Sequence, residues 1–498
     1  MRDIEVLNEP QLEFGHGGRH IDIRFGIMDW GPADVSSDRA PKQITIALIG
    51  MERDVEALRR WLEKCRDPIP AKESKHPNLF PPFPGFREDA AFRSRLALDS
   101  SLERTIPPRE IESLFRRGTH NEIVTAAVDL FLDEMRLLKD KGQPDVILCA
   151  VPPEIEALMD PDERPGGSRR RERDDCIDFH DLLKARAMVS VDVPTQCVLP
   201  GTYDPQRRRQ QKRRKDRVRT LQDEATRAWN LHTALYYKAG GLPWRMVRHP
   251  SEYQACYIGI GFYYTPDREF LRTSMAQVFG ERGDGVIVRG SAVAITKEDR
   301  TPHLSEEAAA ELVQKALRRY RAEHRTAPAR VVLHKTSRFS PDERKGFTTA
   351  LEEEKIELVD LISFDSRSAP RLFRVGKYPV LRGTFVSLSS REHVLYTRGA
   401  VPFHETYPGM HVPRPLLVHL DEITTSSAPE KLAQEILALT KMNWNQTQFD
   451  QRTPITIYAA DKVGKILKYV DDVEDDKVQR RYSYYREPRR KPRNSFRG

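Results

Sequence analysis

The chain has 498 residues and carries 82 Lys and Arg against 74 Asp and Glu, a formal net charge of +8 at pH 7. This length predicts roughly two to four domains. No stretch approaches the roughly 18 consecutive apolar residues of a membrane-spanning helix, so we expect no membrane partner.

The five cysteines occur singly along the sequence, without a CxxC pair or a nearby pair of histidines. This spacing argues against a disulfide framework and against a structural zinc site. The N-terminal segment MRDIEVLNEPQLEF contains acidic residues early and lacks the basic and then apolar pattern of a signal peptide. We therefore expect a cytoplasmic protein with reduced thiols.

The first half of the chain alternates predicted strands and helices. QITIALIGM (43–51) has the pattern of a buried strand and runs directly into a helix with one apolar face. A second amphipathic helix ends at Gly142 and is followed by the predicted strand PDVILCAVP (144–152). A further long helix ends at Gly240. This order predicts an open α/β domain up to about residue 245, with ligands near strand ends and helix starts.

Basic residues are concentrated in three places. Nine of the thirteen residues in 207–219 are basic, SRRRER occupies 168–173 within a Pro-, Gly- and Arg-rich loop (160–175), and further basic residues lie in 486–498. Such clusters attract polyanions, and arginine beside tyrosine can also stack on bases. Each cluster alone also fits a solvated loop or tail. The three together favour nucleic acid as a partner.

The second half has a different element order. Three strands joined by hairpins precede an amphipathic helix that Ser305 caps and that runs to His324, and then come a strand, a helix opened by Pro341 and another strand. The order β-β-β-α-β-α-β is typical of an RNase H-like domain. The predicted strands are 252–264, 275–280, 285–293, 329–336 and 355–363.

A nuclease of this architecture needs carboxylates at defined positions to hold its metal ions. Two divalent cations about 4 Å apart need carboxylates on the first strand and at the end of the fourth. Neither strand offers one at these positions. Asp267 and Asp342 lie near by, but they better fit a turn residue and a helix N-terminal residue. The sequence therefore predicts a domain that holds a duplex without cutting it.

Four segments carry a resemblance to a known family: YYKAGGLPW (236–244), CYIGIGFYY (256–264), VVLHKTSRF (331–339) and KMNWNQTQFDQRTPITIYAADKVGKI (441–466). With them, the chain resembles a short prokaryotic Argonaute. The resemblance implies a Rossmann-like MID domain with an N-terminal segment and the basic loop 160–175, followed by an RNase H-like PIWI domain. These would occupy 1–245 and 246–485, and 486–498 would be a basic tail.

The resemblance also places the cleavage machinery. In cleaving relatives, Asp stands where this chain has Gly261 and Thr336. The chain therefore resembles the catalytically inactive branch, with these two as degenerate catalytic positions. Two alternatives stay open from the sequence: an active guide-directed endonuclease that uses other acids, and a guide-independent single-strand binding protein that uses the basic block 207–219.

The resemblance further implies that His180, Lys184, Gln196 and Lys238 bind the 5′-phosphate of a guide strand. On a helix, residues four apart share one face, so His180 and Lys184 can converge on one phosphate. A terminal phosphate bears nearly two charges, which several cationic donors distinguish from an internal diester. Each residue also has a structural interpretation as a cap, a solvated side chain, a loop residue or a charge at a helix end.

By the same resemblance, the guide is a small RNA and the target is complementary single-stranded DNA. Relatives act in prokaryotic immunity against plasmids and phage, with a partner protein in which an APAZ domain is fused to a TIR, sirtuin-like or DNase effector. Activation of the effector leads to abortive infection. Mg²⁺ at the guide phosphate is a further expectation, but because residues follow YSYY (482–485), its protein ligands stay unassigned.

Overall fold

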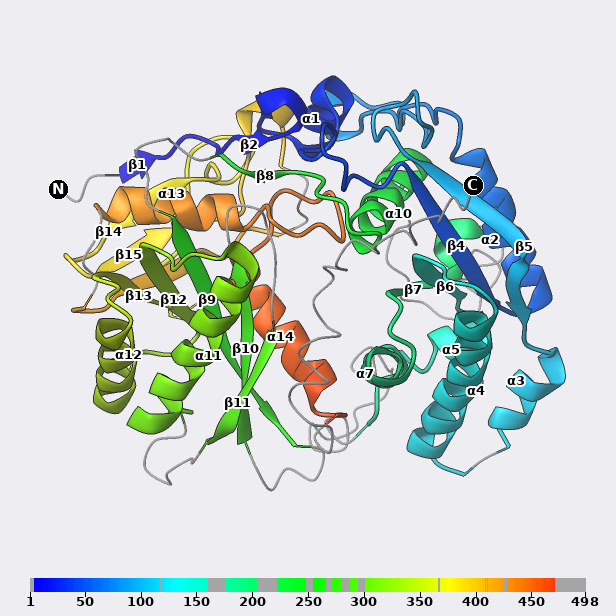
Figure 1. The fold of residues 1–498 in the computed structure, drawn as a ribbon. Coiled ribbons are helices and arrows are strands. Elements are labelled where there is room, and N and C mark those ends of the chain that lie inside the picture. Colours follow the sequence, from blue (N-terminus) through cyan, green and yellow to red (C-terminus); the bar gives the residue numbers. More distant parts are fainter. Residues whose placement is uncertain are drawn as a thin grey trace, which may run out of the picture.

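The computed structural model describes residues 4–470, apart from 117, 160–175, 205–221, 248–253, 266–270, 280–286, 294–300, 366–367, 408, 410 and 424–427. The described chain forms two lobes, each built on its own sheet (Figure 1). The basic clusters 168–173 and 207–219, the loop 160–175, Asp267 and the tail 486–498 lie outside the described residues.

The smaller sheet has four parallel strands in the order β5-β4-β6-β7. The predicted open α/β arrangement is therefore confirmed. The apolar runs of β4 and β6 are almost wholly buried, as expected of central parallel strands covered on both faces. The strands are β4 (Gln43–Gly50), β5 (Arg95–Thr105), β6 (Val146–Ala150) and β7 (Thr195–Val198).

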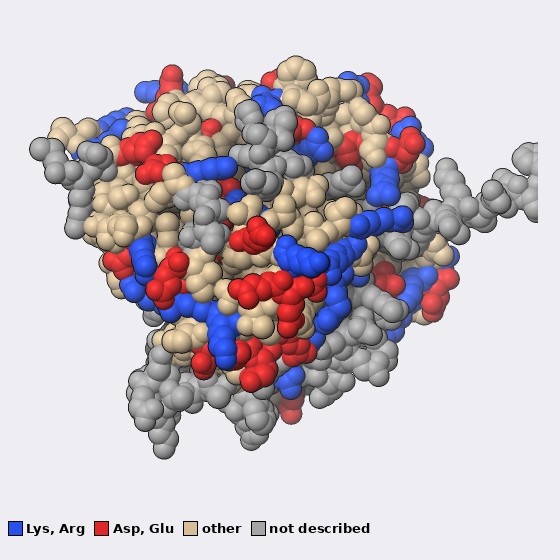
Figure 2. Space-filling view, turned by 60° about the vertical axis from the view of Figure 1, so that its left-hand side comes forward, with Lys and Arg blue, Asp and Glu red and all other residues tan. Residues whose placement is uncertain are grey.

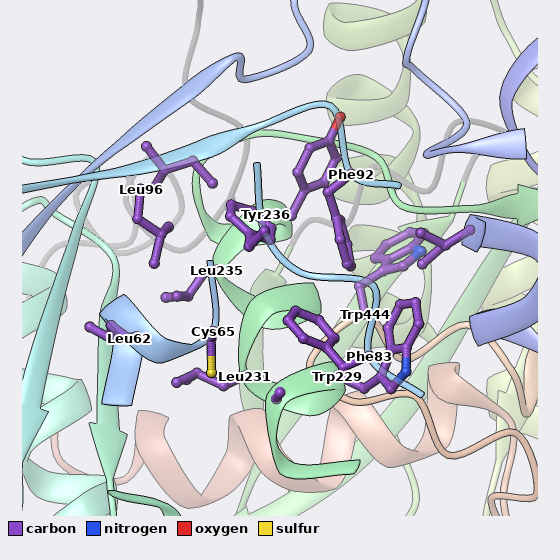
Figure 3. Packing of buried hydrophobic residues seen from close by; sticks show 14 of the residues in the cluster. Leu62, Cys65, Phe83, Phe92, Leu96, Trp229, Leu231, Leu235, Tyr236 and Trp444 are labelled. Carbon is purple, nitrogen blue, oxygen red and sulfur yellow. The ribbon is translucent and has the colours of Figure 1, made fainter. Parts of the chain in front are cut away.

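Helices cover both faces of this sheet. Alternate residues of β6 point to opposite sides, so that Leu148 packs with α2 and α10 while Ile147 packs with α4 and α7. Figure 3 shows side chains on two sides of α10: Leu231 and Leu235 lie towards Leu62 of α2, and Trp229 lies beside Phe83. The helices of this lobe are α2 (Glu52–Lys64), α3 (Pro108–Leu114), α4 (His120–Lys141), α5 (Pro153–Glu156), α7 (Phe179–Ser190), α8 (Pro200–Tyr203) and α10 (Glu224–Lys238).

The larger sheet has nine strands in the order β1-β14-β15-β16-β13-β12-β9-β10-β11. Its centre is parallel, with β12 between β9 and β13, and its flanks are antiparallel. The predicted RNase H-like order is confirmed. The strands are β1 (Ile4–Val6), β9 (Ala255–Tyr264), β10 (Leu271–Phe279), β11 (Ile287–Val293), β12 (Arg330–Lys335), β13 (Leu358–Asp365), β14 (Thr384–Ser387), β15 (Glu392–Leu395) and β16 (Leu416–Leu420).

Two pairs of helices cover the larger sheet. On one face lie α11 (Glu306–His324), whose first turn Ser305 caps as predicted, and α12 (Pro341–Glu353). On the other face lie α13 (Pro429–Leu439) and α14 (Ile455–Leu467). A Cβ atom on Gly259 of β9 would lie 2.2 Å from the carbonyl oxygen of Thr456. Glycine at this position therefore allows α14 to approach the sheet.

The N-terminal segment runs along the lobe of the larger sheet. β1 pairs with β14 at the edge of that sheet, and the half-buried carboxylate of Glu9 lies 2.6 Å from Lys441 Nζ and 2.8 Å from Arg382 Nε. A small sheet of β3 (Arg19–His20), β2 (Leu12–Glu13) and β8 (Arg245–Met246) and the helix α1 (Ile23–Trp30) follow. The domain boundary at residue 245 stays a prediction.

Two tryptophans, Trp244 and Trp444, form hydrogen bonds and packing contacts between the lobes. Trp244 donates its indole N–H to the carbonyl of Lys441, and Trp444 donates to the carbonyl of Trp244, both at 3.0 Å. Trp444 also packs against Tyr237 of α10, with ring centroids 5.0 Å apart. Because all three rings are buried or half-buried, the end of α10 is fixed against the segment that leads into α14.

One face of the molecule carries side chains of both charge signs. Figure 2 shows acidic and basic side chains side by side on the face that it brings forward. Ion pairs of this kind join α12 to its neighbours: Lys345 to Glu306 at 2.9 Å, and Arg344 to Asp421 at 3.0 Å. The described part of this face is therefore no single-sign basic field. In the described part of the chain, no helix is long and apolar enough to cross a bilayer.

Candidate anion-binding site

The site begins at the start of α7. Asp178 caps this helix by accepting the backbone N–H of Asp181 at 2.8 Å. Phe179, Leu182 and Leu183 are buried, which leaves His180 and Lys184 half-buried on the other side, one turn apart. The expectation that they share one helix, four positions apart, is confirmed.

Lys238 lies at the end of α10 and is almost completely buried, with 3% of its surface exposed. Its Nζ donates to Oδ1 of Asn445 at 2.8 Å. Burial and the nearby positive charge of Lys184 lower the pKa of Lys238 to about 7. Lys184 on α7 thus lies close enough to Lys238 at the end of α10 to disfavour the charged form of Lys238. An anion placed near both would relieve this repulsion.

The imidazole of His180 lies beside a carboxylate. Its Nδ1 is 3.1 Å from Oδ1 of Asp181, a contact that fixes the orientation of the ring. Burial and the charge of Lys184 nevertheless lower the pKa of His180. Near neutral pH, His180 is therefore mainly neutral and contributes orientation and hydrogen bonding more than charge.

Gln196 occupies β7, as expected, but its side chain turns back on its own strand. Nε2 donates to the carbonyl of Cys197 at 2.8 Å. Cys197 is the member of this strand whose pKa responds to Lys184 and Lys238. The structure thus brings Lys184, Lys238 and His180 together, while the amide N–H of Gln196 donates to the backbone of its own strand.

Several further residues of the site come from the segment 441–466. Asn445 accepts the bond from Lys238, and burial raises the pKa of Tyr458 of α14 against the opposing charge of Lys184. Burial raises the pKa of Asp181, but the contact with His180 and the charges of Lys468 and Lys462 outweigh this effect, so that the pKa is lowered overall. The sequence of this segment carries part of the family resemblance but predicts no site residue.

Three donors at the start of α7 could hold a cation. Oxygen or nitrogen atoms of Asp178, His180 and Asp181 all lie within 4.8 Å of one another, and this is the one such group of three or more found among the described residues. Two carboxylates suit Mg²⁺, whereas an imidazole nitrogen is more typical of transition metals. The two aspartates therefore fit a divalent cation beside a bound phosphate, and His180 fits it less well.

Gly261 and Thr336, which the sequence predicts to be degenerate catalytic positions, lie next to each other. In the parallel register of β12 and β9, Lys335 stands opposite Ile260, so Thr336 follows beside Gly261. Lys335 itself points to the other face, where its Nζ lies 2.6 Å from Oε1 of Glu343 in a fully buried ion pair. Asp342 lies in the first turn of α12, as predicted.

A comparison with protein families matches the Piwi domain over residues 173–472, more than half of the chain. The chain therefore belongs to the Piwi domain family. A search of curated proteins finds no match.

Solved structures are similar in fold. Argonaute of Clostridium butyricum, bound to a guide DNA and a target DNA, is 14% identical, with a TM-score of 0.62 over 94% of this chain and 53% of its own. Drosophila Piwi is 16% identical, with a TM-score of 0.58 over 97% and 56%. Argonaute of A. aeolicus is 15% identical, with a TM-score of 0.54 over 93% and 53%. The chain is thus Argonaute-like in fold and spans about half the length of these proteins.

Proposed function

We propose that this chain binds the 5′-phosphate of a small guide RNA between α7 and the end of α10, and that it holds the guide paired with complementary single-stranded DNA. The observation that carries the proposal is the burial of the Lys238 amine within the electrostatic influence of Lys184. A phosphate dianion compensates both charges, whereas an internal diester carries only about one charge and has no free end to enter the site.

The protein and the guide strand would contribute differently to target recognition. The protein grips a charged strand end and the backbone, while base pairing between guide and target supplies sequence specificity. A divalent cation between Asp178, Asp181 and the phosphate would offset the repulsion between these anions. When bound, such an ion supplies charge neutralisation, and the lysines still supply the hydrogen bonds.

Cleavage is not part of the proposed function. Glycine and threonine stand at the neighbouring positions 261 and 336, and neither side chain supplies a carboxylate for a catalytic metal ion. Any enzymatic activity that follows target recognition must then come from another protein. We propose a partner with an APAZ domain and a TIR, sirtuin-like or DNase effector, which target recognition switches on in defence against plasmids or phage.

A comparison of guide ends tests the proposal. Equilibrium affinities are measured for one oligonucleotide with a 5′-phosphate or a 5′-hydroxyl, as RNA and as DNA. We expect the phosphate to strengthen RNA binding by roughly 1.5–3 kcal/mol, the range of charge-assisted hydrogen bonds. Equal affinities for both ends would instead indicate a guide-independent single-strand binding protein. Product from a guide-matched target in Mg²⁺ or Mn²⁺ would instead indicate an active endonuclease.

A further inference from the structure

Two thiols lie side by side at the edge of the smaller sheet. Cys149 of β6 is the registered partner of Cys197 of β7, and both pack on the side of the sheet that α4 and α7 cover. Adjacent strands lie about 4.8 Å apart, within the range of Cα separations, roughly 4.4–6.8 Å, that a disulfide can bridge. Both cysteines are free thiols in the structure.

The two thiols differ in their surroundings. Cys149 is fully buried, whereas Cys197 is half-buried. A hydrogen bond between them raises the pKa of Cys149, together with its burial. The same hydrogen bond lowers the pKa of Cys197, with help from the charges of Lys184 and Lys238 against that of Asp178. Cys197 is therefore the thiol of the pair that loses its proton more readily, and the buried Cys149 keeps its proton and donates the hydrogen bond.

We propose that Cys197 and Cys149 form a peroxide-reactive thiol pair, and that a phosphate bound at Lys184 and Lys238 protects it. The second half of this proposal rests on the proposed function, and the first half does not. The pair is a nucleophilic thiol with a resolving thiol one strand away, which is the usual arrangement of oxidation-sensitive cysteines.

The chemistry balances with a hydroperoxide as oxidant. The Cys197 thiolate attacks one oxygen of hydrogen peroxide, the O–O bond breaks, and hydroxide leaves and takes up a proton. Cys197 is then a sulfenic acid. The sulfur of Cys149 attacks it, the S–O bond breaks, and water leaves with the proton of Cys149. Two thiols and one peroxide thus give one disulfide and two waters.

The protection follows from competition for the same positive charge. A phosphate dianion between Lys184 and Lys238 takes up the interactions that favour the Cys197 thiolate and adds repulsion to it. The thiolate fraction of Cys197 then falls, and oxidation slows by at most about tenfold for each unit by which the pKa rises. Cys65 and Cys256 provide internal comparisons, because burial raises the pKa of each thiol.

The experiment uses the full chain in three states: free, with a 5′-phosphorylated oligonucleotide and with its 5′-hydroxyl counterpart. Each is treated with hydrogen peroxide, alkylated and digested, and the Cys149–Cys197 disulfide is quantified by mass spectrometry. We expect the disulfide in the free protein, and formation at least several-fold slower with the phosphorylated strand at saturation. Cys149→Ala, which keeps the buried position apolar, should leave a sulfenic acid at Cys197 that dimedone traps.

Two results would overturn the proposal. The first is a free protein in which Cys65 or Cys256 reacts as fast as Cys197, or in which no Cys149–Cys197 disulfide forms. The second is equal oxidation with both strands although the phosphorylated one binds more tightly. If instead the two strands bind equally, the failure lies with the proposed function, and the disulfide in the free protein still supports the thiol pair.

Discussion

Thr336 follows the last registered pair of β12 and β9 and therefore lies beside Gly261, at the ends of the two central parallel strands. Cleaving enzymes of this architecture need carboxylates at this place to hold their metal ions. The register would therefore let carboxylates at these two positions share one metal ion, although the positions are separated widely in the sequence.

Restoring both carboxylates should create a partial metal site. We expect the double variant Gly261→Asp with Thr336→Asp to bind Mn²⁺ at least about tenfold more tightly than the unaltered chain, on the order of 1.4 kcal/mol. Isothermal titration calorimetry measures this gain. Each single substitution is the control, because one carboxylate alone offers too few oxygen ligands. A double variant that binds no more Mn²⁺ than the singles would contradict the neighbouring placement.

The affinity for a 5′-phosphate should depend on pH. Burial and the charge of Lys184 lower the pKa of Lys238 to about 7. A bound dianion favours the protonated lysine, so the complex holds a proton that the free protein loses above pH 7. Affinity should therefore fall as the pH rises above 7, by at most about tenfold per unit. Below about pH 6 the phosphate gains a proton, so binding should weaken there also.

Binding of 5′-phosphate and 5′-hydroxyl strands from pH 5.5 to 9 checks this profile, and the hydroxyl strand removes the contribution of the rest of the backbone. Lys238→Met should flatten the alkaline limb. Lys345→Ala, on the distant α12, is the matched lysine control and should keep it. An alkaline limb that survives in Lys238→Met would assign the titration to another group.

Gly259→Ala should destabilise the lobe of the larger sheet. The new Cβ atom would lie 2.2 Å from the carbonyl oxygen of Thr456, which belongs to the backbone and cannot move without α14. Overpacking of this kind costs about 1–3 kcal/mol in the free energy of unfolding. Denaturant unfolding measures the loss. Gly118→Ala, whose nearest contact would be 3.5 Å, should stay close to the unaltered chain.

Glu9→Ala should weaken the attachment of the N-terminal segment. Its carboxylate compensates Lys441 and Arg382, both of which are fully buried. Removing the partner of a buried charge costs about 3–5 kcal/mol. Thermal unfolding and limited proteolysis near residue 9 check this, and Glu5→Ala, on an exposed position of β1, is the control. An unchanged melting temperature in Glu9→Ala would show that the segment contributes little to stability.

Much of the fold was readable from hydrophobic periodicity. The apolar runs of β4 and β6 and the amphipathic patterns of α2, α4 and α11 predicted these elements within a few residues. β5 was missed. It is an edge strand with the sequence RLALDSSLERT and only two fully buried residues, so neither a continuous apolar run nor a strict alternation marks it.

The site was readable only in part. His180 and Lys184 follow from helical spacing, because a local period decides which side chains share a face. Asn445, Cys197 and Tyr458 reach Lys184 or Lys238 only through tertiary packing of α14 and β7 near α10. No local pattern encodes that proximity. The pairing of Cys149 with Cys197 likewise depends on the strand register, which single cysteines in a sequence do not reveal.

A thermodynamic cycle between the strand end and Lys238 tests the central claim most directly. Affinities of the unaltered chain and of Lys238→Met are measured for the same RNA with a 5′-phosphate and with a 5′-hydroxyl. We predict that the phosphate strengthens binding to the unaltered chain and loses most of this advantage, at least about 1 kcal/mol, in the variant. An equal advantage in both proteins would show that the 5′-phosphate does not meet this buried lysine.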